Sequence, residues 1–115
     1  MSKKPFYLTT AIDYPNAKPH VGHAYEKIVG DLISRWHKLA GEDVFFLTGT
    51  DEHGQKIQNT AAVARKNPQA FVDQQVEHFK LLCDKLNIQY SNFIRTTDKK
   101  HVKTAVELFK KVQEK

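Results

Sequence analysis

The fold of this chain is indicated first by residues 6–25, which read FYLTTAIDYPNAKPHVGHAY. Aromatic and β-branched residues over 6–12 are typical of a buried β-strand. Turn-forming residues over 13–19 predict a loop. From about residue 20 to residue 39, apolar side chains recur at three- and four-residue steps, which predicts an amphipathic helix that Gly41 ends.

The alternation of strand and helix continues along the chain. Residues 44–48 are almost wholly apolar and predict a strand of a parallel sheet covered on both faces. A weak helical pattern follows, and Asn67-Pro68 then indicates the start of another helix. Residues 93–95 predict a short strand, and Thr97-Asp98 is expected to cap a last helix with one apolar side. This order is typical of βαβ units, so we expect an α/β fold with a parallel sheet and flanking helices.

Length and composition narrow the class of protein. The chain has 115 residues, of which 40% are hydrophobic and 27% charged, with a net charge of +5. A chain of this length can bury one hydrophobic core. A Rossmann-type sheet normally has two halves, and this sequence supplies only one of them, so we expect an incomplete domain. No apolar run can span a membrane and no secretory signal is evident, so we expect a cytoplasmic protein without a membrane partner. The single cysteine excludes a disulfide framework.

Polar side chains gather in the two loops that follow the predicted strands, where open α/β sheets bind ligands. In the first loop, His20 and His23 lie at a helix N-terminus and can donate hydrogen bonds to phosphate oxygens. Gly22 between them lets a flat ring approach the backbone. Two alternatives stay open: the histidines only cap the helix, or they bind zinc with Asp51 and His53, although the usual zinc pair is spaced four residues apart.

The second loop carries Asp51, Glu52 and His53 and closes at Gly54. A carboxylate at the end of a strand suits recognition of a substrate ammonium group. Two alternatives stay open here: the paired carboxylates serve acid–base chemistry, or Asp51 caps the next helix. Glu52 is expected to be solvated or structural.

Three stretches resemble one known family. Residues 11–25, AIDYPNAKPHVGHAY, closely resemble the HIGH region of class I aminoacyl-tRNA synthetases, in the form typical of the methionyl-tRNA synthetase family. Residues 45–57, FFLTGTDEHGQKI, and residues 93–98, FIRTTD, resemble further stretches of the same family. The resemblance implies that residues 1–115 are the N-terminal portion of the catalytic, nucleotide-binding Rossmann domain.

The resemblance also implies an activity and its site. The family activates methionine with ATP, supplied as its Mg²⁺ complex, to methionyl-adenylate and transfers the methionyl group to tRNA(Met). The matching positions are His20 and His23 for catalysis; Asn16, His20, Gly22 and His23 for ATP; and Ile12, Tyr14 and Asp51 for methionine. Asp13 is assigned no role. No metal ligand is expected in this chain, because the family's zinc belongs to a connective-peptide region beyond it.

The expected partner is the remaining C-terminal part of the enzyme, which carries the KMSKS loop, so we expect little or no activity from this chain alone. Two other interpretations stay open. A small HxGH-type nucleotidyltransferase would share the first loop, but it does not usually carry the GTDEHG loop. A non-catalytic module would bind nucleic acid through the lysine-rich last helix, with a steep salt dependence and no response to ATP.

Overall fold

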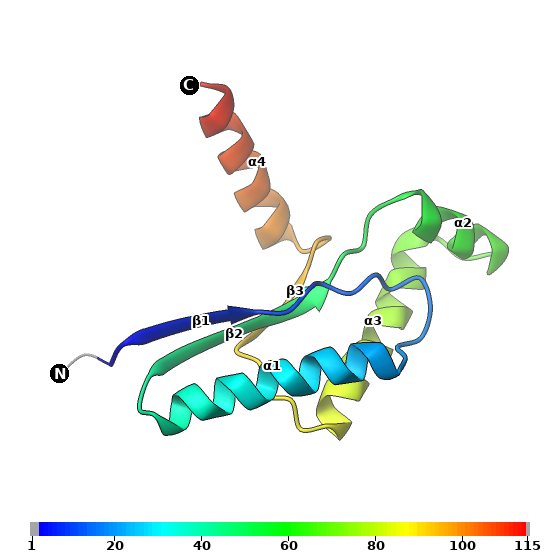
Figure 1. The fold of residues 1–115 in the computed structure, drawn as a ribbon. Helices are drawn as coiled ribbons and strands as arrows, with labels where there is room; N and C mark the ends of the chain where they lie inside the picture. The colour runs from blue at the N-terminus through cyan, green and yellow to red at the C-terminus, as the bar shows by residue number, and fades with distance from the viewer. Residues whose placement is uncertain (1–2, 115) are drawn as a thin grey trace.

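The computed structural model describes residues 3–114, and these form one parallel sheet with helices beside it (Figure 1). The elements are β1 (Pro5–Thr9), α1 (Val21–Leu39), β2 (Asp43–Thr50), α2 (Gln55–Val63), α3 (Pro68–Lys85), β3 (Asn92–Arg95) and α4 (Lys99–Gln113). The strands lie in the order β1-β2-β3, with Tyr7 opposite Phe45 and Gly49 opposite Ile94. The predicted parallel α/β fold is therefore confirmed.

The helix boundaries follow local signals in the sequence. His20 is the N-cap of α1, and Gly41 follows its C-terminus with φ of +85°, a backbone conformation that favours glycine. At the start of α3 the Asn67 side chain accepts a hydrogen bond of 2.9 Å from the Gln69 amide. At α4 the prediction is only half right: Asp98 is the N-cap, but its side chain bonds no helix amide.

Strand β1 ends at Thr9, so the prediction of a strand is wrong for residues 10–12. The Thr10 amide still donates to the Leu47 carbonyl of β2 at 3.1 Å, but the Ala11 amide and carbonyl instead bond the side chains of Glu26 and Lys27 of α1, at 3.0 and 3.3 Å. The chain then returns to β2 for a single bridge between Asp13 and Thr50. Strand β2 is correspondingly longer than predicted, since its last residues reach both this bridge and β3.

Helices α1 and α3 share one face of the sheet. The fully buried ring of Phe46 lies against Gly30 of α1 and packs with Cys83 of α3. A second apolar cluster joins α2 to α3 and receives the ring of Tyr14 from the loop after β1. Its buried members are Ile57, Ala61, Phe71 and Val72.

The opposite face of the sheet is open over the described residues. Tyr7 and Phe45 stack there with ring centroids 5.7 Å apart, and Tyr7 is 63% exposed. Helix α4 runs away from the sheet, and none of its residues is buried (Figure 1). The expectation of a sheet covered on both faces is therefore wrong for this part of the chain.

This openness leaves an unusually large surface. The accessible area is 8151 Å², whereas a compact protein of this mass exposes about 6,400 Å². The radius of gyration is 16.5 Å, against about 13 Å for a compact domain of this length. Within residues 3–114 no helix has both the length and the apolar character needed to cross a membrane.

Candidate functional site

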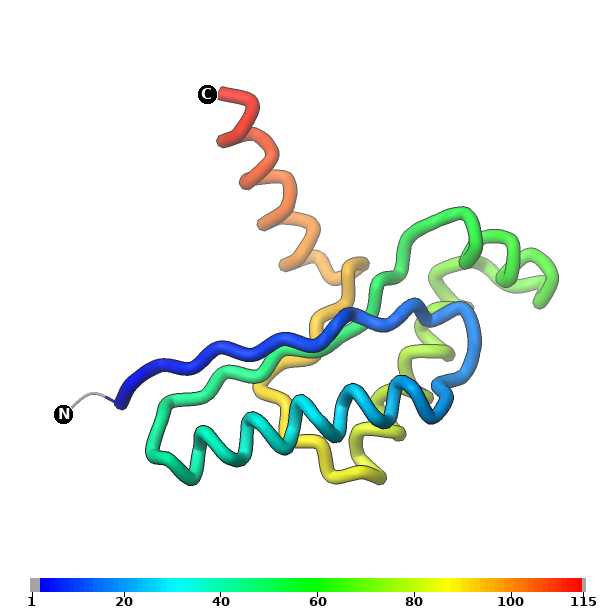
Figure 2. The backbone as a smooth tube through the Cα atoms, in the orientation of Figure 1, coloured from blue at the N-terminus to red at the C-terminus, as the bar shows by residue number. Residues whose placement is uncertain are grey.

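Two loops meet at the carboxyl end of the sheet. Loop 1 (residues 10–20) follows β1 and loop 2 (residues 51–54) follows β2, and the backbone trace shows both leaving the sheet at the same end (Figure 2). The Asp13 amide donates to the Gly49 carbonyl at 2.8 Å, and the Asp51 amide donates to the Asp13 carbonyl at 2.8 Å. The loops therefore form one bonded unit.

His20 at the end of loop 1 and His23 in the first turn of α1 cap this helix. Nδ1 of His20 accepts from the Gly22 amide at 3.1 Å, and Nδ1 of His23 accepts from the His20 amide at 3.0 Å. This reciprocal arrangement is a capping box, and the two rings lie 3.9 Å apart between centroids. Both histidines therefore cap the helix, and their Nε2 atoms take no part in the cap.

Because the cap uses Nδ1 of each histidine, only Nε2 of each ring is left to contact a ligand. Because each Nδ1 is an acceptor, the proton of each neutral imidazole lies on Nε2, which becomes a donor. Burial lowers the pKa of His23 below its ordinary value, although the Asp13 carboxylate opposes the shift. Two Nε2–H donors therefore lie at the positive end of α1, a suitable place for phosphate.

Gly22 is required by the cap itself. A Cβ at this position would lie 2.9 Å from Cε1 of His20, closer than real side chains approach. The same absence of a side chain leaves the backbone open to a flat ring on its outer side. The cap therefore favours glycine at this position, and the contact of Gly22 with an adenine ring stays a prediction.

Asp51 has the placement expected of an ammonium receptor. It is half-buried directly after β2, and within residues 3–114 its carboxylate has no hydrogen bond or ion pair. Nearby, Ile12 is 40% exposed, and the Tyr14 hydroxyl donates to the His53 carbonyl at 2.7 Å. The Asn16 amide bonds back to the Tyr14 carbonyl at 2.9 Å, which folds loop 1. Contacts of these residues with a ligand stay a prediction.

A buried ion pair in loop 1 is missing from the sequence-based prediction. Lys27 of α1 lies 2.8 Å from the Asp13 carboxylate, and both side chains are almost fully buried. Burial raises the pKa of Asp13, against the opposing effect of the Lys27 ammonium. One sequence signal for this pair exists: Lys27 lies four residues after His23 and so shares its side of the helix.

Glu52 is not a partner of Asp51 in acid–base chemistry. Its side chain is fully buried, and Arg95 binds it through two hydrogen bonds of 2.7 and 2.9 Å. Of the two expectations for Glu52, the structural one is confirmed and the solvated one is wrong.

The histidines do not assemble with loop 2 into a metal site. His53 Nε2 lies 3.3 Å from the Thr96 carbonyl, so its ring is directed toward the end of β3. Over residues 3–114 no group of three or more histidine, cysteine or acidic side chains is placed to hold a metal ion.

The parallel sheet, the capped His-x-Gly-His turn at the first helix, and a loop whose Asp51 carboxylate is unpaired within residues 3–114 together form the arrangement expected of a class I synthetase. Residues 6–115 match the family model described as tRNA synthetases class I (M), and the chain belongs to this family.

Similar proteins agree with this assignment. The chain is 47% identical to a methionine–tRNA ligase of Clostridium tetani over 114 residues, which are 99% of this chain and 18% of that protein. It is 52% identical to the Thermotoga maritima methionine–tRNA ligase over 109 residues, 95% of this chain and 17% of that protein. The chain thus spans less than a fifth of the length of these relatives.

Solved structures show the same backbone. The Mycobacterium tuberculosis methionyl-tRNA synthetase in complex with methionyl-adenylate matches with a TM-score of 0.94 and 48% identity, over 96% of this chain and 22% of that one. An Agrobacterium radiobacter K84 LeuRS–tRNA–LeuAMS complex matches with a TM-score of 0.84 and 25% identity, over 95% of this chain and 15% of that one.

Proposed function

We propose that the chain is the N-terminal portion of the catalytic domain of a methionine–tRNA ligase. In the first step, a methionine carboxylate oxygen attacks the α-phosphorus of ATP, and pyrophosphate leaves as methionyl-adenylate forms. In the second, the methionyl group passes to the terminal ribose of tRNA(Met) and AMP leaves. The supporting observation is the bonded pair of loops that presents Nε2–H donors on one side and the Asp51 carboxylate on the other.

Loop 1 and the start of α1 are assigned to ATP, which enters as its Mg²⁺ complex. The Nε2–H groups of His20 and His23 donate to phosphate oxygens and stabilise the charge that develops as pyrophosphate leaves. Asn16 adds a side-chain donor, and the adenine ring lies against the backbone at Gly22. No protein nucleophile is needed, so these residues act by positioning and charge stabilisation.

Loop 2 is assigned to the amino acid. The Asp51 carboxylate binds the methionine ammonium group through a charge-assisted hydrogen bond. Ile12 and Tyr14 form part of the wall around the thioether side chain. This wall is open over the described residues, so this chain by itself selects weakly between methionine and leucine, because even one methylene group in an apolar pocket is worth only about 1–3 kcal/mol.

The remaining C-terminal part of the enzyme is the proposed partner. The chain exposes about 1,700 Å² more than a compact protein of its mass, and a stable interface takes about 800 Å² from each partner. Much of the exposed apolar surface lies on the outer side of α1, where Trp36 is 70% exposed, and on the open sheet face around Tyr7. Any zinc site of the enzyme is assigned to that remaining part.

Methionine-dependent ATP–pyrophosphate exchange tests the proposal. The chain is assayed alone, mixed with a separately produced C-terminal remainder of the Thermotoga maritima relative, and fused to that remainder. We expect little or no exchange from the chain alone, and exchange in the mixture or the fusion. A folded fusion without exchange would reject the ligase function. Salt-sensitive nucleic-acid binding that ignores ATP would then favour the non-catalytic module.

Matched variants of the fusion test the residue assignments. Asp51→Asn should raise the KM for methionine, whereas Asp43→Asn, at the exposed start of the same strand, should not. His23→Ala should lower kcat, whereas His101→Ala on α4 should leave it unchanged. Equal effects within either pair would contradict the corresponding role.

A further inference from the structure

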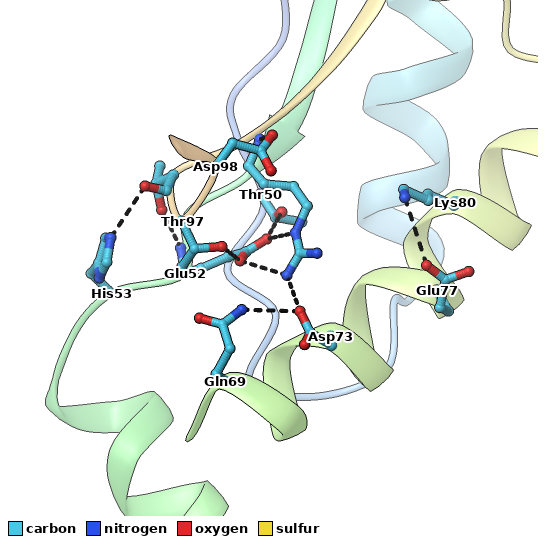
Figure 3. A network of polar contacts seen from close by, with 11 residues as sticks. Thr50, Glu52, His53, Gln69, Asp73, Glu77, Lys80, Thr97 and Asp98 are labelled. Atoms are coloured by element: carbon cyan, nitrogen blue, oxygen red, sulfur yellow. Dashed lines mark hydrogen bonds and ion pairs between the residues drawn. The ribbon is translucent and has the colours of Figure 1, made fainter. Parts of the chain in front are cut away.

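The Glu52 carboxylate accepts four hydrogen bonds, three of which come from Arg95 and Thr97 and anchor loop 2 to the end of β3 (Figure 3). Besides the two bonds from Arg95, the Thr50 hydroxyl donates at 2.6 Å and the Thr97 hydroxyl at 2.5 Å. The side chain has no exposed surface. Each lone-pair direction of this carboxylate therefore has a donor, and none is left for a substrate.

Arg95 extends the contact to α3. Its Nη2 lies 2.5 Å from Asp73 Oδ1, and the Gln69 amide group donates to the same oxygen at 3.0 Å (Figure 3). A planar guanidinium that engages two carboxylates in this way has a single preferred orientation. The position of the Glu52–Arg95 pair is thus fixed jointly by loop 2, β3 and α3 rather than by loop 2 alone.

The backbone around Asp51 is bonded on both sides. The Glu52 amide donates to the Thr96 hydroxyl at 2.8 Å, and the Thr96 amide donates to the Thr50 carbonyl at 3.2 Å. On the other side, the Asp51 amide donates to the Asp13 carbonyl. Asp51 is therefore held between two fixed peptide groups, and its carboxylate retains only side-chain rotation.

We propose that Glu52 and Arg95 are positioning residues that hold Asp51 in the orientation for binding the methionine ammonium group. This inference rests on the proposed function for its ligand, but the restraint on loop 2 is a property of the chain itself. Neither residue touches substrate. Their contribution is to fix the carboxylate before methionine arrives, so that binding does not have to order the loop.

The charge of the pair supports this role. Burial by itself raises the pKa of Glu52, but the hydrogen bonds from Arg95, Thr50 and Thr97 together bring it below its ordinary value. Glu52 is thus ionised at neutral pH and keeps its attraction for Arg95 throughout the working range. Replacing Arg95 removes a two-pronged donor that lysine, with a single compact charge, does not reproduce.

The test compares two arginine-to-lysine variants. Arg95→Lys weakens the anchor of loop 2. Arg35→Lys is the matched control, because Arg35 binds the buried Asp31 at 2.5 Å and the Asn87 carbonyl at 2.6 Å, away from both loops. Glu52→Gln is the second anchor variant, since it keeps the shape of the side chain and removes its charge.

The first measurement is hydrogen exchange of the Asp51 and Glu52 amides in the full 115-residue chain. We expect faster exchange in Arg95→Lys and Glu52→Gln than in Arg35→Lys, after correction for any change in global stability. Equal exchange in all three would overturn the proposed restraint. This measurement needs no activity, so it stands apart from the proposed function.

The second measurement is the KM for methionine and for ATP in the fusion used above. We expect Arg95→Lys and Glu52→Gln to raise the KM for methionine about tenfold to hundredfold while the KM for ATP stays within about twofold. A merely structural role would lower the active fraction and leave both KM values unchanged, as expected for Arg35→Lys. That result would overturn the proposal, whereas an inactive wild-type fusion would reject the proposed function and leave the restraint to be judged by exchange.

Discussion

Replacing Lys27 with methionine leaves the Asp13 carboxylate buried without its counter-charge. Lys27 is 1% exposed and Asp13 6% exposed, and the two charged groups lie 2.8 Å apart. Removing one partner of a buried pair costs about 3–5 kcal/mol. Because domains of this size are stable by about 5–15 kcal/mol, Lys27→Met should lose much of its stability, with a thermal midpoint lower by about 10–20 °C.

The control is the double variant Asp13→Ala/Lys27→Met. It removes both charges, and apolar replacement of a buried pair is often neutral, so most of the lost stability should return. The single variant should also recover part of its deficit as the pH falls from 7 to 5. Burial already raises the pKa of Asp13, and losing Lys27 raises it further. The folded chain then binds more protons than the unfolded chain, so its stability increases with acidity.

Urea unfolding followed by circular dichroism measures these differences, provided that the slope of free energy against urea is the same in all variants. If Lys27→Met lowered the free energy of unfolding by less than about 1 kcal/mol, the reasoning would be refuted, because a buried carboxylate without its partner should destabilise the fold by more than that. A double variant as unstable as the single one would also refute it, because the cost would then come from lost packing rather than lost charge.

Three further predictions concern the sheet, the core and loop 2. Gly49→Ala should destabilise the chain more than Gly41→Ala in thermal unfolding, because a Cβ at Gly49 would overlap the Ile94 carbonyl, while Gly41 faces open space and costs only about 1–2 kcal/mol for its positive φ. The Cys83 thiol, buried and with its pKa raised to about 11, should react with a disulfide reagent at pH 8 only as fast as the chain opens, and urea should abolish this protection. Folding lowers the pKa of Glu52, so the stability that this residue contributes is present above its ordinary pKa of 4.5 and is lost as the pH falls below that value. Glu52→Gln should therefore make the free energy of unfolding less dependent on pH over this range.

The sequence correctly predicted those helix ends that depend on hydrogen bonds between neighbouring residues. The start of α1 at His20, its end before Gly41, and the Asn67 cap of α3 depend on bonds within a few residues. The end of β1 was wrong because it depends on distant residues: the Ala11 amide and carbonyl bond Glu26 and Lys27 of α1 instead of β2. The helical periodicity of α4 correctly predicted a helix, but it did not show that this helix buries none of its residues in the described chain.

For the site, residue type and order predicted His20, His23 and Asp51, because open α/β sheets bind ligands in the loops that follow their strands, and the ligand contacts of these residues stay a prediction. The sequence did not show that the histidines cap α1 through Nδ1, which assigns their protons to Nε2. It also left Asp13 without a role, although its backbone joins the two loops.

The sequence by itself thus determined the α/β class, the two loops and the family, because periodicity, caps and motifs are written in neighbouring residues. Only the tertiary structure decided which charged side chains are buried. Four charged residues look like ordinary surface residues in the sequence. In the structure they form two ion pairs, Asp13–Lys27 and Glu52–Arg95, and each residue is buried or half-buried beside a partner from a different element. The reason is physical: a charge is stable inside a protein only where the fold brings an opposite charge and further hydrogen bonds to it, and those partners lie far away along the chain.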